Sequence, residues 1–172
     1  MKRLIITAFL LHSGCDDGGT EGEDASSGDS GSDAVDPVEV QAMADGYAAF
    51  ERINATPTAS QHGNASTVNW WVPAEYSTMY RTLDPDAVAA ATFPEGALVV
   101  KEHLDEEGAP DGYTMMFKGP PGTNDEANEW WFARVTPDGA LAENGAVGFC
   151  MNCHRAVEQS DWLYGVPLDN RR

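Results

Sequence analysis

The feature that most constrains this 172-residue chain lies near its C-terminal end, where Cys150, Cys153 and His154 form a C-x-x-C-H motif. Residues three apart lie on one side of a helix, so two thiols at this spacing can reach the two vinyl groups of one porphyrin. The residue that follows can then present its imidazole to the iron. The motif therefore predicts one covalently attached haem c, with Cys150 and Cys153 as attachment residues and His154 as the iron ligand.

Two other interpretations of the cysteine pair stay open as less favoured alternatives. A thiol-disulfide redox pair is expected near the start of a helix in a βαβ unit, and no such unit is visible in the sequence. A structural zinc site needs two more ligands, and the candidates His62 and His103 stand singly, without finger spacing. Because no methionine follows Met151, the haem differs from that of small electron-transfer cytochromes c, and we expect an open sixth position on the iron.

The N-terminal segment is typical of an exported protein. Lys2 and Arg3 precede an apolar run from Leu4 to Leu11, which predicts a signal peptide over residues 1–14. Cys15 follows a lipoprotein-like cleavage site, which predicts a lipid anchor at a membrane of the cell envelope, although a secreted or periplasmic protein with an incidental cysteine is the alternative. Residues 15–36 are predicted to form a disordered acidic tether, since they are almost devoid of apolar side chains.

The formal net charge of −18 limits the partners that this chain can bind. Such a surface repels nucleic acid and anionic lipid, so we expect no nucleic-acid partner and membrane contact only through the lipid anchor. A basic, soluble cytochrome that accepts electrons is electrostatically acceptable, as is a small neutral or cationic substrate.

Residues 37–172 are predicted to form a single α+β domain. Asp36 and Pro37 begin an amphipathic helix whose apolar stripe is Val40, Met43, Tyr47 and Phe50. Alternation and β-branched or aromatic residues predict strands, and Asp84-Pro85 predicts a short alanine-rich helix. The predicted strands are Thr67 to Val72, Ser77 to Leu83, Gly96 to Leu104, Gly112 to Lys118 and Glu129 to Thr136. Because no long helical crossover separates them, we expect a mainly antiparallel β-sheet with a few flanking helices and a C-terminal haem-attachment helix.

Several segments, taken in order, resemble the cytochrome P-460 family, which includes the cytochromes c-prime-beta. The F-P-x-G-x-x-x-x-K-E element and the late haem motif are the most specific of them. The matching stretches are Tyr47 to Ile53, Ser60-Gln61-His62-Gly63, Phe93 to Glu102, Tyr113 to Lys118, Glu129-Trp130-Trp131-Phe132 and Phe149 to His154, running on to Asp161-Trp162-Leu163-Tyr164.

The resemblance implies an antiparallel-sheet fold, a homodimer, a five-coordinate haem and a small nitrogenous ligand or substrate. In the members that oxidise hydroxylamine, a strand lysine is bonded to the porphyrin, and Lys101 occupies that place in the motif. Glu143 is our candidate for the distal proton acceptor. In the c-prime-beta members apolar side chains cap the distal face and favour nitric oxide. Phe93 is the candidate cap, and the alternative is a core phenylalanine at the end of a strand.

Three functional hypotheses follow. The leading one is a P-460-type cytochrome that oxidises hydroxylamine or a similar nitrogen compound, with Lys101 and Glu143 as catalytic residues. The second is a c-prime-beta-like protein that binds nitric oxide without catalysis. The third is a six-coordinate electron-transfer cytochrome in which His62 or His103 is a second iron ligand. For Lys101 itself, the alternative is a solvated lysine on an edge strand.

Overall fold

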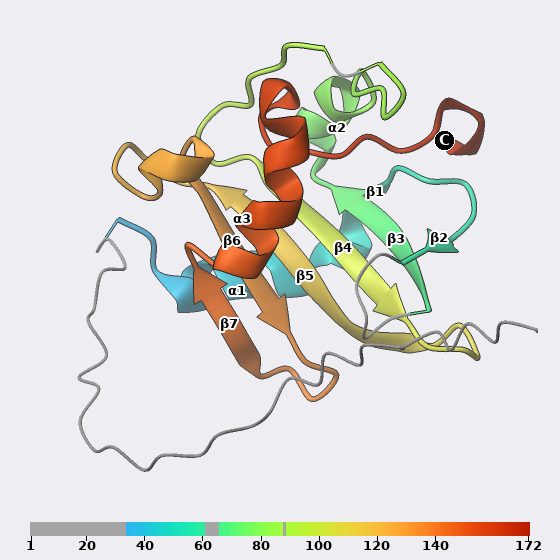
Figure 1. Ribbon diagram of the computed structural model, residues 1–172. Coiled ribbons are helices and arrows are strands. Elements are labelled where there is room, and N and C mark those ends of the chain that lie inside the picture. Colours follow the sequence, from blue (N-terminus) through green and yellow to red (C-terminus); the bar gives the residue numbers. More distant parts are fainter. Residues whose placement is uncertain (1–33, 61–65, 88) are drawn as a thin grey trace, which may run out of the picture.

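A computed structural model of the chain describes residues 34–60, 66–87 and 89–172. Within them a seven-stranded sheet has the strand order β1-β3-β4-β5-β6-β7, with β2 paired to β3, and every pair is antiparallel (Figure 1). This confirms the predicted fold class. The strands are β1 (Glu51–Arg52), β2 (Thr58–Ala59), β3 (Thr67–Val72), β4 (Leu98–Leu104), β5 (Pro110–Lys118), β6 (Trp130–Val135) and β7 (Leu141–Gly145).

Short helices flank this sheet. The α-helices are α1 (Pro37–Asp45), α2 (Ala74–Tyr80) and α3 (Gly148–His154), and the 3-10 helices are η1 (Tyr47–Ala49), η2 (Asp125–Ala127), η3 (Arg155–Ser160) and η4 (Leu168–Asn170). In Figure 1, α3 crosses one face of the sheet and α1 lies behind the other. None of the helices in the described part of the chain is long and apolar enough to cross a membrane. The predicted signal peptide, Cys15 and residues 16–33 of the predicted tether lie outside the described residues.

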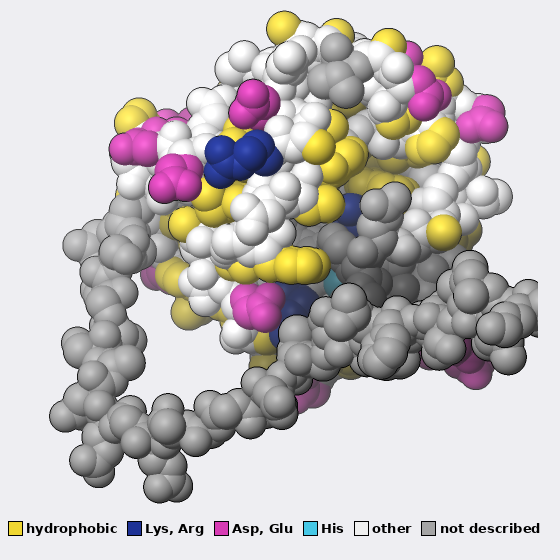
Figure 2. All heavy atoms as spheres, viewed as in Figure 1, with side chains coloured by type: hydrophobic (Ala, Val, Ile, Leu, Met, Phe, Trp, Pro, Cys, Tyr) yellow, Lys and Arg dark blue, Asp and Glu magenta, His cyan; other side chains and the backbone are white. Residues whose placement is uncertain are grey.

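Because side chains alternate along each strand, the sheet carries one hydrophobic core on each face. The α1-side core packs α1 and η1 against the sheet, and its buried members are Val35, Val40, Ala44, Leu98, Val100, Tyr113, Met115, Trp131, Ala133 and Val135. The α3-side core lies under α3 and the C-terminal segment, and includes Val68, Trp70, Val72, Val99, Met116, Trp130, Phe132, Met151 and Leu163. In the space-filling view of the α3 side, hydrophobic side chains are visible over much of this face, and most acidic side chains lie toward its margins (Figure 2).

The predicted first helix is confirmed, with one error in its buried stripe. The Asp36 carboxylate caps it by accepting from the backbone N–H of Val38 at 2.8 Å. Met43, however, is 47% exposed, and Ala44 is buried in its place. The reason is that α1 ends at Asp45 and continues as the tighter η1, so one helical period does not run through to Phe50.

Two predictions between β3 and β4 are wrong. The predicted strand over Ser77 to Leu83 is occupied by α2 and a following turn, since Pro73 introduces the helix and Tyr76 and Tyr80 lie four residues apart on it. The alanine-rich helix after Asp84 does not form in the residues described there. The segment instead bends over residues 85–87 and is irregular from residue 89, and the N–H of Ala91 donates to the Gln159 carbonyl in η3.

The central strands agree with the predictions and their register positions the site. Lys101 of β4 pairs with Trp70 of β3 on one side and with Thr114 of β5 on the other. Thr114 pairs in turn with Arg134, and Arg134 pairs with Glu143 of β7, a strand that the sequence did not predict. This cross-strand row therefore leads from the middle of the sheet to its edge.

Candidate functional site

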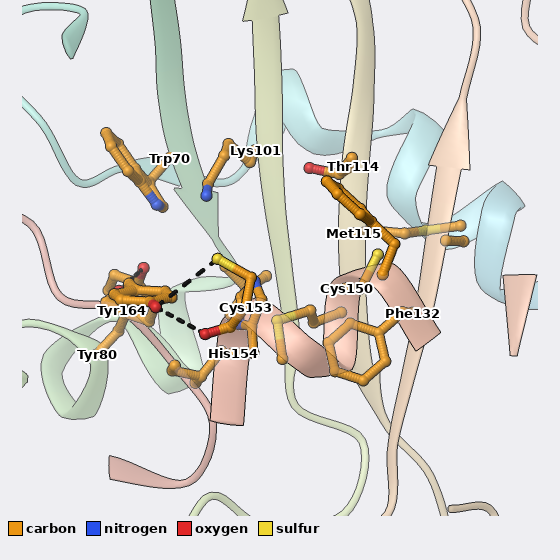
Figure 3. A pocket seen from close by; sticks show the side chains of 15 residues that line it. Trp70, Tyr80, Lys101, Thr114, Met115, Phe132, Cys150, Cys153, His154 and Tyr164 are labelled. Atoms are coloured by element: carbon orange, nitrogen blue, oxygen red, sulfur yellow. Dashed lines mark hydrogen bonds between the residues drawn. The ribbon is translucent and has the colours of Figure 1, made fainter. Parts of the chain in front are cut away.

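The C-x-x-C-H motif lies on α3 and faces the sheet across an open cavity (Figure 3). Cys150 is half-buried against the α3-side core and Cys153 is exposed, and neither thiol is in a disulfide. Two adjoining hollows, with about 650 and 790 Å³ of empty space that includes their openings, make up this cavity. They share five lining residues, which are Trp70, Lys101, Cys153, His154 and Tyr164.

The imidazole of His154 is oriented by its surroundings. Its Nδ1 lies 2.6 Å from the carbonyl oxygen of Trp162, and because a carbonyl can only accept, Nδ1 must donate. The rings of Phe132 and Tyr164 pack edge-on against it, with centroids at 5.6 and 5.2 Å. Burial lowers the pKa of His154 to about 4, and the positive charge of Lys101 acts in the same direction. His154 is therefore neutral near pH 7, and its Nε2 is left as the atom that can ligate iron.

Tyr164 also fixes the end of the attachment helix. Its hydroxyl donates to the carbonyl oxygen of Cys153 at 2.8 Å and lies 3.8 Å from the sulfur of the same residue. Its own carbonyl accepts from the hydroxyl of the buried Tyr80 at 2.7 Å. The sequence analysis did not single out Tyr164, since a tyrosine ten residues after a haem motif carries no spacing signal by itself.

Lys101 extends from β4 toward α3, as Figure 3 shows, and lines both hollows. Its Nζ lies 5.3 Å from the centre of the Trp70 ring. Burial lowers the pKa of Lys101 to about 8, whereas negative charge on the Cys153 and Cys150 thiols would raise it. The alternative of a solvated lysine on an edge strand is wrong, because β4 lies between β3 and β5.

Thr114 is the polar side chain beside Lys101 that the sequence analysis missed. It lines the cavity from β5, and its Oγ1 lies 3.3 Å from Nε2 of His103. Only the β4–β5 register could have revealed it, and a sequence does not give that register. His103 itself is fully buried on the same face and does not line either hollow. His62 lies outside the described residues.

The structure does not bring Phe93 and Glu143 to the cavity lining. Phe93 is buried in the α3-side core, where its ring lies 6.4 Å from that of Tyr80 and 6.2 Å from that of Trp130. Glu143 is exposed on β7, with its carboxylate 3.5 Å from Nε of Arg134. It is nevertheless close enough to the motif for its charge to act with burial in raising the pKa of the Cys150 thiol.

These residues fit a c-type haem. Two cysteines on one side of a short helix face this cavity. The cavity is lined mainly by apolar side chains, as a porphyrin requires, and the hydrogen bond of His154 directs Nε2 to the iron. In residues 34–60, 66–87 and 89–172, no group of three or more His, Cys, Asp or Glu side chains could hold a metal ion, so these residues form no zinc site of that kind.

Comparison with known families shows the family to which the chain belongs. The cytochrome P460 family model matches residues 45–165, which include β1 to β7, Lys101 and the complete attachment motif. The chain belongs to the cytochrome P460 family. No curated protein matches the chain. Membership in the cytochrome P460 family implies a haem c cytochrome, in agreement with the cysteine pair and the orientation of His154.

Proposed function

We propose that this chain is an exported mono-haem cytochrome of the P460 type that oxidises hydroxylamine or a similar small nitrogen compound at an open iron position. The observation that carries the proposal is the placement of Lys101, which faces the cavity opposite Cys150, Cys153 and His154 (Figure 3). Family membership supports the haem, and the depressed pKa of Lys101 supports a chemical role for its amine.

The roles of the attachment residues follow from their positions. The sulfurs of Cys150 and Cys153 would form thioether bonds to the porphyrin, and Nε2 of His154 would bind the iron. The haem supplies one-electron chemistry at its iron when it is bound. The protein holds the imidazole in one tautomer and keeps apolar side chains, among them Val99, Met116 and Leu163, around the bound group.

Lys101 is proposed as the third covalent link between protein and porphyrin. An amine that is buried in an apolar cavity loses its proton more readily and becomes a nucleophile. Thioether formation would remove the thiol charges that raise its pKa, which favours the neutral amine further. Bonding Nζ to a porphyrin carbon releases two protons and two electrons, so the step needs an external oxidant such as a peroxide.

The proton and electron balance of the proposed reaction defines what else is needed. Two hydroxylamine molecules would give nitrous oxide and water and release four protons and four electrons. Thr114 is placed to orient a small polar substrate beside Lys101. Glu143, at the outer end of the cross-strand row through Thr114 and Arg134, would accept protons from the solvent side rather than at the iron.

The partners and location are part of the same proposal. A basic, soluble cytochrome would accept the electrons, since the chain carries a net charge of −18. Phe149, which is 77% exposed beside Cys150, offers an apolar contact at the cavity rim. We also propose the arrangement expected from the sequence, with a leader over residues 1–14, a lipidated Cys15 and tether over 15–36, a haem domain over 37–172, and a homodimer.

A second candidate function is supported by the cavity lining. Apolar side chains predominate, and the described lining residues include no carboxylate. Such a site favours nitric oxide over more polar ligands, as expected for a c-prime-beta-like binding protein. The six-coordinate alternative has less support, because His103 is held at Thr114 and does not line the cavity.

The decisive experiment uses the matured holoprotein with hydroxylamine and a soluble electron acceptor. We expect reduction of the acceptor together with nitrous oxide, measured by absorbance and by gas chromatography. The Lys101→Met variant, loaded with haem to the same extent, is the matched control and is expected to lose turnover. A holoprotein that binds nitric oxide but neither reduces the acceptor nor releases nitrous oxide would establish the second candidate instead.

A further inference from the structure

A second group of polar residues lies beneath the proximal side of the site, in a place that the proposed reaction does not use. The carboxylate of Asp161 is completely buried, and the Nζ of Lys118 contacts its two oxygens at 2.7 and 2.9 Å. The same carboxylate accepts from the side-chain amide of Asn128 at 2.5 Å and from the backbone N–H of Phe93 at 2.6 Å. Neither Lys118 nor Asp161 lines the haem cavity.

The backbone at this point is in an unusual conformation. Asp161 and Trp162 have φ angles of 55° and 65°, in the left-handed region that non-glycine residues seldom adopt. Two such residues in succession persist only when surrounding contacts fix them. The bonds to the Asp161 side chain provide those contacts, and they connect the turn to β5 through Lys118 and to the loop before β6 through Asn128.

This turn presents one group to the haem site, the carbonyl oxygen of Trp162. That oxygen accepts from Nδ1 of His154 at 2.6 Å and so sets the direction of the imidazole. A hydrogen bond at the far nitrogen of a metal-binding histidine also makes the ligating nitrogen more basic. The position of the Trp162 carbonyl therefore bears directly on the bond that His154 would make to iron.

We propose that Lys118 and Asp161 are positioning residues for the proximal histidine, acting through the Trp162 carbonyl. Lys118 lies on β5 and forms an ion pair with Asp161. The contacts of Asp161 fix the turn, and the Trp162 carbonyl in this turn accepts the hydrogen bond that orients His154. The inference rests on the proposed haem ligation by His154 and goes beyond it. A buried ion pair gives little net stability compared with apolar residues of the same shape, so the proposal concerns the geometry that the pair imposes on the turn.

The test compares three variants of the matured holoprotein with wild type. Asp161→Asn keeps a residue that tolerates the left-handed conformation, and Lys118→Met removes the cation. The double variant carries neither charge, so it also serves if Lys118→Met alone leaves an unpaired carboxylate and fails to fold. Iron and haem content are measured first, because a chain that never binds haem contradicts the proposed function rather than this inference. The readouts are the iron–histidine stretching frequency of the ferrous protein and the reduction potential.

If the pair positions the histidine, each readout should shift in the same direction in all three variants. A looser carbonyl weakens the bond to Nδ1, so the stretching frequency should fall and the ferric state should lose stability. We expect the ratio of ferrous to ferric protein to rise about tenfold at a fixed potential, equivalent to about 59 mV for one electron. Glu102→Gln is the matched control, since Glu102 is also a buried carboxylate with three donors but belongs to the opposite face.

The result that would overturn the proposal is equally specific. A purely electrostatic influence of the pair on the haem would shift the potential upward in Asp161→Asn and downward in Lys118→Met, and would leave the neutral double variant at the wild-type values. A double variant with an unchanged stretching frequency and potential therefore excludes positioning, and so does a control that shifts as far as the double variant.

Discussion

The ammonium nitrogen of Lys101 lies 5.3 Å from the centre of the Trp70 ring, on the side of the cavity that faces the haem-attachment helix. The contact joins two neighbouring strands, since Trp70 and Lys101 are register partners in β3 and β4. It holds Lys101, the one lysine among the described lining residues, on the α3 side of the sheet.

Replacing Lys101 with methionine should abolish a cross-link that survives denaturation. In the wild-type holoprotein, trypsin digestion should leave the peptide with Lys101 joined to the peptide with Cys150 and Cys153, as mass spectrometry would show. The Lys101→Met variant should yield these peptides separately, and its ferrous Soret band should return from a red-shifted position to that of an ordinary haem c. Cleavage after Lys118 serves as the internal control. Separate peptides in the wild type would rule out the cross-link.

The thioether bonds and the iron ligand should respond differently to substitution. Combined replacement of Cys150 and Cys153 by alanine should abolish covalent haem, because both attachment sulfurs are lost. The His154→Ala variant should keep thioether-linked haem while losing the proximal bond. Its absorption spectrum should change, while the mass of the haem peptide should differ from wild type only by the substitution. Haem that stays covalently bound after both cysteines are removed would contradict the assignment of the motif.

Thr114→Val should change ligand binding without affecting haem attachment. Valine has nearly the same shape as threonine but lacks the hydroxyl that lies between His103 and the cavity. We expect about fivefold weaker binding of hydroxylamine and little change for nitric oxide, measured by optical titration, since one hydrogen bond contributes about 1 kcal/mol. Equal weakening of both ligands would point to a repacked cavity instead.

The stability of the holoprotein should fall between pH 6.5 and about 4, in part because of His103. Burial and the charge of Lys101 lower the pKa of this histidine from 6.5 to about 4. In this interval the unfolded chain takes up a proton that the folded protein does not, so the free energy of unfolding decreases as the pH falls. Urea unfolding of His103→Gln should show a shallower dependence on pH over the same interval. An identical slope would mean that His103 titrates normally.

Tyr47→Phe should destabilise the protein without altering the haem. The Tyr47 hydroxyl donates to Glu102 at 2.9 Å, and Glu102 also accepts from Asn69 at 2.9 Å and from Trp71 at 3.0 Å. Loss of one donor to a buried carboxylate should lower the free energy of unfolding by about 1 to 3 kcal/mol. Because this cluster lies on the α1 side of the sheet, the absorption spectrum and ligand affinity should stay at wild-type values.

The sequence predicted the fold best where a pattern depends on nearby residues alone. Asp36 and Pro37 mark the start of α1, and the alternation from Leu98 to Leu104 marks β4, because capping and alternation are local properties. The prediction failed over Ser77 to Leu83, where aromatic residues that suit a strand form α2 instead. The irregular path after Asp84 depends on contacts with distant residues, such as Ala91 with Gln159.

The candidate site shows the same division between local and distant information. The attachment motif could be predicted because its chemistry is contained in five consecutive residues. The facing position of Lys101 came from a family resemblance, and the structure places it across the cavity from the motif. Thr114 and the Trp162 carbonyl could not be predicted, since one depends on strand register and the other on a turn closed by Lys118 from another strand.

The presence of a separate core on each face of the sheet has a consequence for maturation. All members of the α1-side core are supplied by the polypeptide, so packing on this face does not depend on haem attachment. On the opposite face, a haem attached to α3 would contact core residues such as Phe132 and Leu163, which line the cavity. Haem attachment should therefore stabilise the packing on the α3 side of the sheet more than the packing on the α1 side.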